Sequence, residues 1–184
     1  MVTLYTQQLT IADDSLLDFI KRCDELGYNN NNSLEDLKFD WCMDIGGAWF
    51  ATYKNNEMIS LSGLHPWANG WRMLFRGAQT EARPIGLNRH HMQSYGFYYQ
   101  LPMQLQFAFG DNIDIDNDFA YITTNTDNDA SGKMTRINKT FTHLEKSGLV
   151  DGLGESEVYG VTQNTWLLNI NNYNNIRVNY DIEH

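Results

Sequence analysis

Cysteine is scarce in this sequence, and its scarcity sets the first limits on what the protein can be. The 184 residues contain two cysteines, Cys23 and Cys42, nineteen positions apart, and neither has a paired ligand nearby. A structural zinc site needs several such ligands, so we predict no metal site. No charged-then-apolar segment typical of a secretion signal begins the sequence. We therefore expect a cytoplasmic protein with two free thiols.

Positive charge and long apolar runs are also scarce. Lysine and arginine total 13 against 23 acidic residues, which gives a formal net charge of -10. Such a chain lacks the basic surface of a general nucleic-acid-binding protein. No apolar run approaches the length of a membrane-spanning helix, so we expect no membrane insertion. The notable basic concentration comprises Arg72, Arg76, Arg83 and Arg89, which leaves open a local site for an anion.

The sequence does contain enough apolar material for a folded core. Hydrophobic residues make up 42% of the chain and aromatic residues 13%, so we do not expect wholesale disorder. The length favours a single domain over residues 1–184. Asparagine is concentrated after residue 168, and asparagine competes with helical hydrogen bonding and tolerates left-handed backbone. We therefore expect an irregular tail over about residues 169–184.

Apolar periodicity and turn residues predict an ordered series of elements: strand, helix, helix, three strands, helix, strand, helix and two strands. The predicted helices begin near Asp13 or Asp14, at Ser33, at Met92 and at Ser131. A loop is expected over residues 65–70, which include Pro66. The predicted strands cover residues 2–10, 48–53, 58–64, 71–77, 119–124, 158–161 and 165–170.

Two of these elements have the clearest patterns. Residues 119–124 are typical of a buried strand, and residues 131–146 of a helix that Gly148 ends. We expect one face of this helix to pack on a central sheet. Four apolar side chains recur on that face at helical spacing: Met134, Ile137, Phe141 and Leu144.

The strand and helix at these positions resemble those of the N-acetyltransferase (GNAT) superfamily. The likeness rests on Ala120-Tyr121-Ile122-Thr123-Thr124-Asn125 and on a helix ending in Leu144-Glu145-Lys146-Ser147-Gly148-Leu149. The order of predicted elements extends the resemblance over most of the chain. It implies an α/β (α+β) fold with a central mixed, mostly antiparallel sheet flanked by about four helices. It also implies an N-acyltransferase that uses acetyl-CoA and acts on an amine, either a small molecule or a protein.

The resemblance also points to a coenzyme site. In the family, a basic loop before the long central helix holds the pyrophosphate of coenzyme A through backbone amides and the helix N-terminus. Residues 76–89 are the corresponding stretch here, and the amides of residues 75–77 are candidates to polarise the thioester carbonyl. The candidate coenzyme-binding residues are Phe75, Arg76, Gly77, Arg83, Arg89 and, at the end of the clearest strand, Asn125.

Catalytic candidates are fewer. His90 could act as a general base because histidine titrates near neutral pH, and Glu81 or Glu57 could remove an amine proton through water. Each has an ordinary alternative, His90 as a loop or helix-capping residue and the glutamates as surface carboxylates. Leu144 stands where the family often has a tyrosine general acid, and leucine cannot donate a proton. The sequence therefore leaves open a second function, a GNAT-fold protein that binds or regulates a partner without catalysis.

Overall fold

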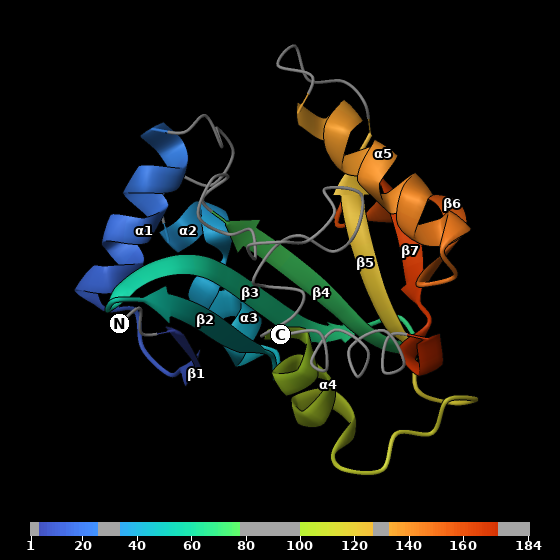
Figure 1. Cartoon of the computed structure of the whole chain (residues 1–184), viewed down its shortest axis with the longest axis horizontal. Helices are drawn as coiled ribbons and strands as arrows, with labels where there is room; N and C mark the ends of the chain where they lie inside the picture. Colours follow the sequence, from blue (N-terminus) through green and yellow to red (C-terminus); the bar gives the residue numbers. More distant parts are fainter. Residues whose placement is uncertain (1–3, 26–33, 78–99, 127–132, 173–184) are drawn as a thin grey trace.

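A single mixed sheet organises the chain (Figure 1). The computed structural model describes residues 4–25, 34–77, 100–126 and 133–172. Seven strands lie in the order β1-β2-β3-β4-β5-β7-β6, and all neighbours are antiparallel except β4 and β5. The predicted mixed, mostly antiparallel sheet is thus confirmed. The strands are β1 (Leu4–Leu9), β2 (Ala48–Lys54), β3 (Glu57–Trp67), β4 (Gly70–Gly77), β5 (Ala120–Asn125), β6 (Val150–Val158) and β7 (Val161–Leu168).

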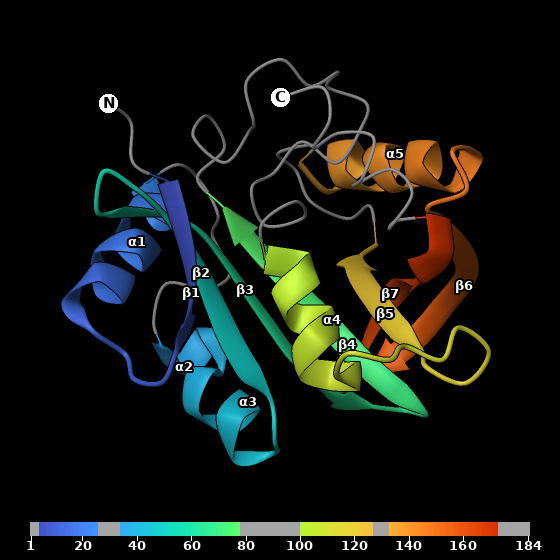
Figure 2. The ribbon, with the colours of Figure 1, turned by 60° about the horizontal axis from the view of Figure 1, so that its bottom comes forward.

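Helices cover both faces of the sheet (Figure 2). One face carries α1 (Asp14–Glu25), α2 (Leu34–Leu37) and α3 (Phe39–Asp44), and the other carries α4 (Leu101–Phe109) and α5 (Lys133–Lys146). The described residues thus form five helices where about four were expected. The second predicted helix is divided because Lys38 takes a left-handed conformation, φ 57° and ψ 41°, between α2 and α3.

Each face of the sheet has its own apolar core. Leu16 and Phe19 of α1 recur at helical spacing and are buried in the same core as Trp49 of β2. Asp13 caps this helix, since its carboxylate accepts a hydrogen bond of 3.0 Å from the backbone N–H of Leu16. On the opposite face, Phe141 of α5 lies in the second core.

The predicted apolar face of α5 is confirmed where its side chains are described. Phe141 and Leu144 are buried, at 8% and 1% exposure. The side chains of Met134 and Ile137 lie outside the described residues. Leu144 is therefore a packing residue, and the position of the family's tyrosine is part of the core between α5 and the sheet.

The prediction of a loop over residues 65–70 was wrong for its first half. Strand β3 continues to Trp67 and pairs with β4 down to Trp67 opposite Gly70. Proline is tolerated in this strand because the ladder with β2 already ends at Leu64. The side of Pro66 that lacks an N–H therefore faces no partner strand among the described residues.

The predicted strand over residues 158–161 was wrong at its centre, because Tyr159 and Gly160 form the turn between Val158, which ends β6, and Val161, which begins β7. Tyr159 and Gly160 both have positive φ, 49° and 81°, as the tight hairpin turn that matches strand twist requires. Strand β6 was missed because it lies at the sheet edge. Among its nine residues only Val150 and Val158 are buried, so it lacks the alternation of a half-buried strand.

Candidate functional site

Strands β4 and β5 pair in parallel for only part of their length, and we call the split between the two strands beyond the paired part the cleft. Their ladder contains three residue pairs, from Trp71 opposite Ala120 to Met73 opposite Ile122. Beyond these pairs β4 continues to Gly77 and β5 to Asn125, and the two strands diverge (Figure 1). The sheet is therefore split between its fourth and fifth strands, with the closed end at Trp71.

The divergence leaves backbone groups directed into the cleft. Each strand remains in the sheet through its outer neighbour, since β4 pairs with β3 as far as Gly77 and β5 with β7 as far as Asn125. Alternate residues of a strand direct their N–H and C=O groups to opposite edges. About half of the amides over residues 74–77 therefore face the cleft, where no described strand pairs with them.

The closed end depends on a close backbone approach. The N–H of Trp71 donates to the carbonyl of Phe119 at 3.0 Å, just before β5 begins. At Gly70 a Cβ atom would overlap that carbonyl oxygen. Glycine is therefore required for β4 and β5 to meet here, and this contact decides where the cleft starts.

The side chain of Arg72 starts on β4 at the closed end of the cleft and reaches across one face of the sheet to β5 and β7. Its Nε donates to Oγ1 of Thr123 on β5 at 2.7 Å, and its Nη2 donates to Oε1 of Gln163 on β7 at 3.2 Å. Its Nη1 lies 3.4 Å from Nε2 of His65 on β3. The guanidinium thus ties three strands together on the α3 side of the sheet and places a positive charge at the closed end. The sequence signal was an arginine within the apolar run of residues 71–75.

His65 supports this arginine as a neutral acceptor. Its ring is fully buried, and its Nδ1 lies 2.9 Å from the carbonyl oxygen of Pro66. Because that oxygen can only accept, Nδ1 carries the proton and Nε2 is left to accept from Arg72. Burial lowers the pKa of His65, and the positive charges of Arg72 and Lys38 lower it further, against the opposing effect of the Pro66 hydrogen bond.

This environment predicts an acid-sensitive fold. Unfolded His65 binds a proton below about pH 6.5, whereas the folded state resists protonation. The contribution of His65 to the free energy of unfolding is therefore complete above about pH 6.5 and is lost as pH falls through the lowered folded-state pKa. We expect urea unfolding between pH 8 and pH 5 to show this loss, and His65→Asn to show a smaller pH slope. His143→Asn in α5 is the matched control, and an equal slope in all three proteins would contradict the assignment.

Asn125 ends β5 on the other side of the cleft and belongs to a network of side-chain hydrogen bonds. Its Oδ1 accepts from Nε2 of Gln163 at 2.9 Å, and its carbonyl oxygen accepts from Nδ2 of Asn138 at 3.0 Å. Asn138 also accepts from the hydroxyl of Thr124 at 2.6 Å. This buried asparagine, next to the apolar stripe of α5, fixes the helix to the end of β5. Asn125 thus belongs to the network that continues through Gln163 to Arg72.

The other predicted site residues divide into those that the structure describes, in β4 and at Glu57, and those that lie outside the described residues. The backbone of Phe75, Arg76 and Gly77 lies in β4 beside the cleft. Glu57, weighed as a base, forms an ion pair with Arg22 of α1 and so belongs to a surface contact. The remaining candidates lie outside the described residues: Glu81, Arg83, Arg89 and His90.

The described part of the chain offers no alternative metal or thiol site. No group of three histidine, cysteine, aspartate or glutamate residues within it could hold a metal ion. Cys42 is a buried free thiol, as predicted, and burial raises its pKa to about 12, so it is unreactive near neutral pH. The side chain of Cys23 is not described. In the same residues no helix is long and apolar enough to cross a membrane.

Solved structures with this arrangement identify the fold. Aminoglycoside acetyltransferase AAC(6')-Ib, in complex with coenzyme A and kanamycin, matches at a TM-score of 0.60 and 8% identity, over 95% of this chain and 99% of that one. An aminoglycoside 6'-N-acetyltransferase complexed with coenzyme A matches at 0.53 and 11%, over 88% and 94%. A protein from Desulfovibrio desulfuricans assigned to the GNAT family matches at 0.54 and 11%, over 90% and 98%.

These likenesses establish the architecture. The chain has the GNAT fold, as its sequence resemblance implied. No protein-family model matches the sequence, and no curated protein sequence matches it.

Proposed function

We propose that this GNAT-fold chain transfers an acyl group from an acyl-coenzyme A to an amine. The observation that supports this most directly is the cleft between β4 and β5, with strand amides directed into it. Two of the matched structures contain coenzyme A. An extended arm with amide groups, such as the pantetheine of coenzyme A, suits a free strand edge because it can pair with backbone N–H and C=O groups.

The proposed donor site extends along β4 into residues 78–89. Of the candidates Phe75, Arg76 and Gly77, the amides of Phe75 and Gly77 lie on the same edge of β4 as the Trp71 N–H, whereas the Arg76 amide faces β3. The amides of Phe75 and Gly77 would hold the thioester end of the donor, with one of them hydrogen-bonded to its carbonyl oxygen. Arg83 and Arg89 would pair with the phosphates, because guanidinium groups form charge-assisted bonds to such oxygens. Asn125 would face the donor from β5. These assignments rest on the family resemblance and on the position of β4.

The chemistry needs a neutral amine nitrogen, whose attack on the thioester carbonyl forms a C–N bond and releases the coenzyme thiol. His90 and Glu81 remain the proposed bases for the amine proton, directly or through water. Leu144 cannot supply a proton to the leaving thiolate, and its side chain is buried in the core between α5 and the sheet. Arg72, held at the closed end, would favour a thiolate by its positive charge.

Calorimetric titration with acetyl-CoA and with free coenzyme A tests the donor site. We expect both ligands to bind, with affinity falling as salt is added because exposed charges contribute. Arg83→Ala or Arg89→Ala should each weaken binding by about 1–3 kcal/mol, the scale of a lost hydrogen bond to a charged group. Lys146→Ala, an exposed charge in the last turn of α5, should leave the affinity unchanged.

The same titration separates the proposal from its rival. A folded protein that gives no heat with about millimolar coenzyme would refute acyl transfer. It would favour a binding or regulatory protein that retains the fold, a reading consistent with leucine at position 144. Binding of coenzyme without thiol release in the presence of amines would favour a binding protein that uses the donor site.

A further inference from the structure

The sequence contains a single Asn-Gly pair, and it lies at the tip of the β3–β4 hairpin, at Asn69 and Gly70. An asparagine followed by glycine is the most exposed to attack by the next backbone nitrogen, because glycine has no side chain to hinder the approach. Asn69 is exposed to solvent, as is Ala68 before it. Water therefore reaches the one asparagine of the chain that has this neighbour.

Contacts with β5, and not the turn itself, determine where this pair lies. In a tight hairpin an Asn-Gly pair usually occupies both central positions. Here Trp67 pairs with Gly70, so the central residues are Ala68 and Asn69, and Ala68 takes a φ of 52°, which residues with a Cβ seldom adopt. Gly70 is instead the first residue of β4, where it lies against the carbonyl group of Phe119. The fold thus needs this glycine directly after the asparagine.

Tyr121 of β5 activates the side-chain amide of Asn69. Its hydroxyl group donates to Oδ1 of Asn69 at 2.5 Å. Attack on Cγ places negative charge on Oδ1, and a donor already directed at that oxygen stabilises the charge as it develops. The hydroxyl is held in place because the Tyr121 side chain is 9% exposed and its ring packs edge-on against Trp67, with centroids 5.2 Å apart. Tyr121 therefore acts as the donor of a simple oxyanion hole.

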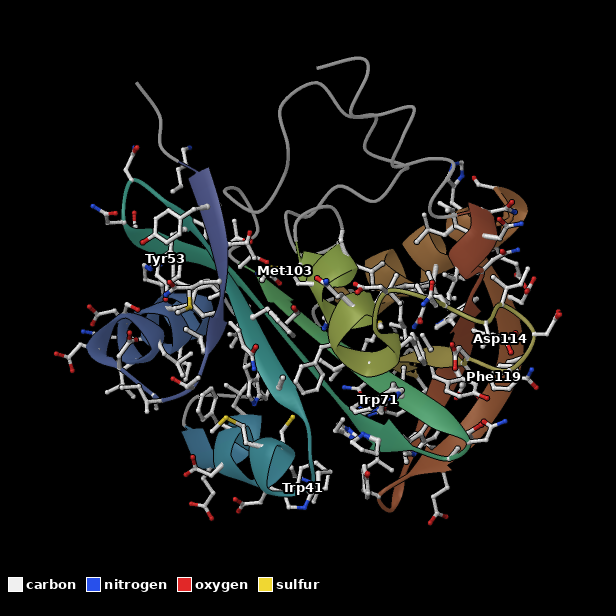
Figure 3. The ribbon with its side chains drawn as sticks, turned by 90° about the horizontal axis from the view of Figure 1, so that it is seen from below. Trp41, Tyr53, Trp71, Met103, Asp114 and Phe119 are labelled. Atoms are coloured by element: carbon white, nitrogen blue, oxygen red, sulfur yellow. The ribbon has the colours of Figure 1, made fainter. Side chains whose placement is uncertain are left out.

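The attacking nitrogen becomes available when one residue pair opens. The N–H of Trp71 is directed to Phe119, at 3.0 Å, so the N–H of Gly70 before it is directed to the opposite edge of β4, toward Trp67. The Trp67–Gly70 pair is the last of its ladder, and such end pairs open more readily than interior ones. Figure 3 shows Trp71 and Phe119 on neighbouring segments, β4 and the chain that enters β5. Opening at the tip thus releases the Gly70 nitrogen while Trp71 stays bonded to Phe119.

We infer that Asn69 is a self-modification site, at which the chain converts its own asparagine to aspartate and isoaspartate. The Gly70 nitrogen gives its proton to solvent hydroxide and attacks Cγ of Asn69. A C–N bond forms, the Cγ–Nδ2 bond breaks, and Nδ2 leaves as ammonia with a proton from water. Water then adds to either carbonyl group of the resulting succinimide and opens the ring. The reaction consumes water, releases ammonia and changes no oxidation state, so it needs no other reactant.

The isoaspartate product changes the closed end of the cleft. In isoaspartate the main chain runs through Cβ and Cγ, which adds one carbon atom to the backbone before Gly70. Gly70 has no room for an added atom on the side of Phe119. The longer backbone must therefore displace Gly70 and weaken the bond from Trp71 to Phe119 that closes the cleft. Aspartate keeps the backbone length and an oxygen that accepts from Tyr121, so it leaves the closed end intact.

Incubation of the folded full chain in mildly alkaline buffer, followed by peptide mass spectrometry and chromatography that separates aspartate from isoaspartate, tests the site. We expect conversion at Asn69 and none at Asn112, which is also exposed but precedes the branched Ile113. Tyr121→Phe keeps the ring and removes the donor, so it should convert about three- to tenfold more slowly, the effect of one hydrogen bond on a rate. In urea, where this hydrogen bond is absent, wild type and Tyr121→Phe should convert at equal rates.

Each outcome decides the inference without reference to acyl transfer, because no coenzyme is present. Conversion at Asn69 no faster than at Asn112 would overturn the site. Faster conversion in folded Tyr121→Phe would also overturn it, since the hydrogen bond would then protect the amide. The purified isoaspartyl protein should unfold at lower urea than the unmodified chain, and Asn69→Asp should unfold with the wild type. An isoaspartyl protein as stable as Asn69→Asp would contradict the proposed change at the closed end.

Discussion

Gly70→Ala is expected to unfold or strongly destabilise the closed end of the cleft and to abolish coenzyme binding. The added Cβ would overlap the carbonyl oxygen of Phe119, which is backbone and cannot rotate away as a side chain can. Strands β4 and β5 would have to separate where their three-residue ladder begins. We expect a loss of about 3 kcal/mol or more in the free energy of unfolding, at or above the upper end of overpacking effects.

Urea unfolding followed by circular dichroism measures this loss, and calorimetry with coenzyme A measures the binding. Gly110→Ala is the control, because a Cβ there meets no atom within 4 Å, although its φ of 72° disfavours alanine. We expect the control to lose about 1–3 kcal/mol, because φ 72° and ψ -156° lie in a backbone region that glycine almost alone adopts, and to retain coenzyme affinity. Wild-type binding by Gly70→Ala would show that the cleft does not depend on this contact.

Trp49→Ala is expected to lower the free energy of unfolding by about 3–5 kcal/mol, the range for truncating a buried tryptophan. Trp49 is fully buried on β2, stacks on Phe39 at 5.6 Å, and donates from Nε1 to the Phe39 carbonyl at 3.1 Å. Its ring also fills the space above Gly63, where a Cβ would come within 2.8 Å of it. Truncation therefore creates a cavity and leaves a carbonyl unpaired.

The effect should extend to Trp41, because Phe39 begins α3, the helix that also carries Trp41. The indole resonance of Trp41 should shift in Trp49→Ala even under native conditions. Leu17→Ala, an apolar truncation at a residue 47% exposed on α1, should change stability by no more than about 0.5 kcal/mol. A Trp49→Ala protein as stable as the control would contradict the assignment of this core.

Local patterns in the sequence were sufficient for most of the element order. The helices α1 and α5 and the strand β5 were predictable because buried side chains recur at the period of the backbone. An aspartate cap at Asp13 or Asp14 and Gly148 at the end of α5, where φ is 74°, were predictable from residue type, and the structure shows Asp13 as the cap. The family resemblance rested on these same elements, so the sequence by itself determined the fold class.

Predictions failed where the local pattern was weak or misleading. Strand β6 lacks alternation because it is an exposed edge, and Pro66 suggested a loop because a sequence does not show which strand edge is unpaired. The break at Lys38 was unpredictable because lysine has no preference for left-handed backbone. In each case the local sequence gives no signal. For the two strands the neighbouring strand that decides the pairing is remote in sequence, and for Lys38 tertiary contacts set the backbone conformation.

The site itself was decided by tertiary structure. The cleft exists because β4 and β5 pair over three residues and then follow different neighbours, which no local pattern encodes. Arg72 meets Gln163 across 91 positions of sequence, and Lys38 meets Tyr159 at the other end of the chain. A single sequence does not indicate that side chains so far apart in the chain will contact each other. Their contacts, a guanidinium bonded to neighbouring strands and an ammonium over two aromatic rings, form only when the folded sheet brings these residues together.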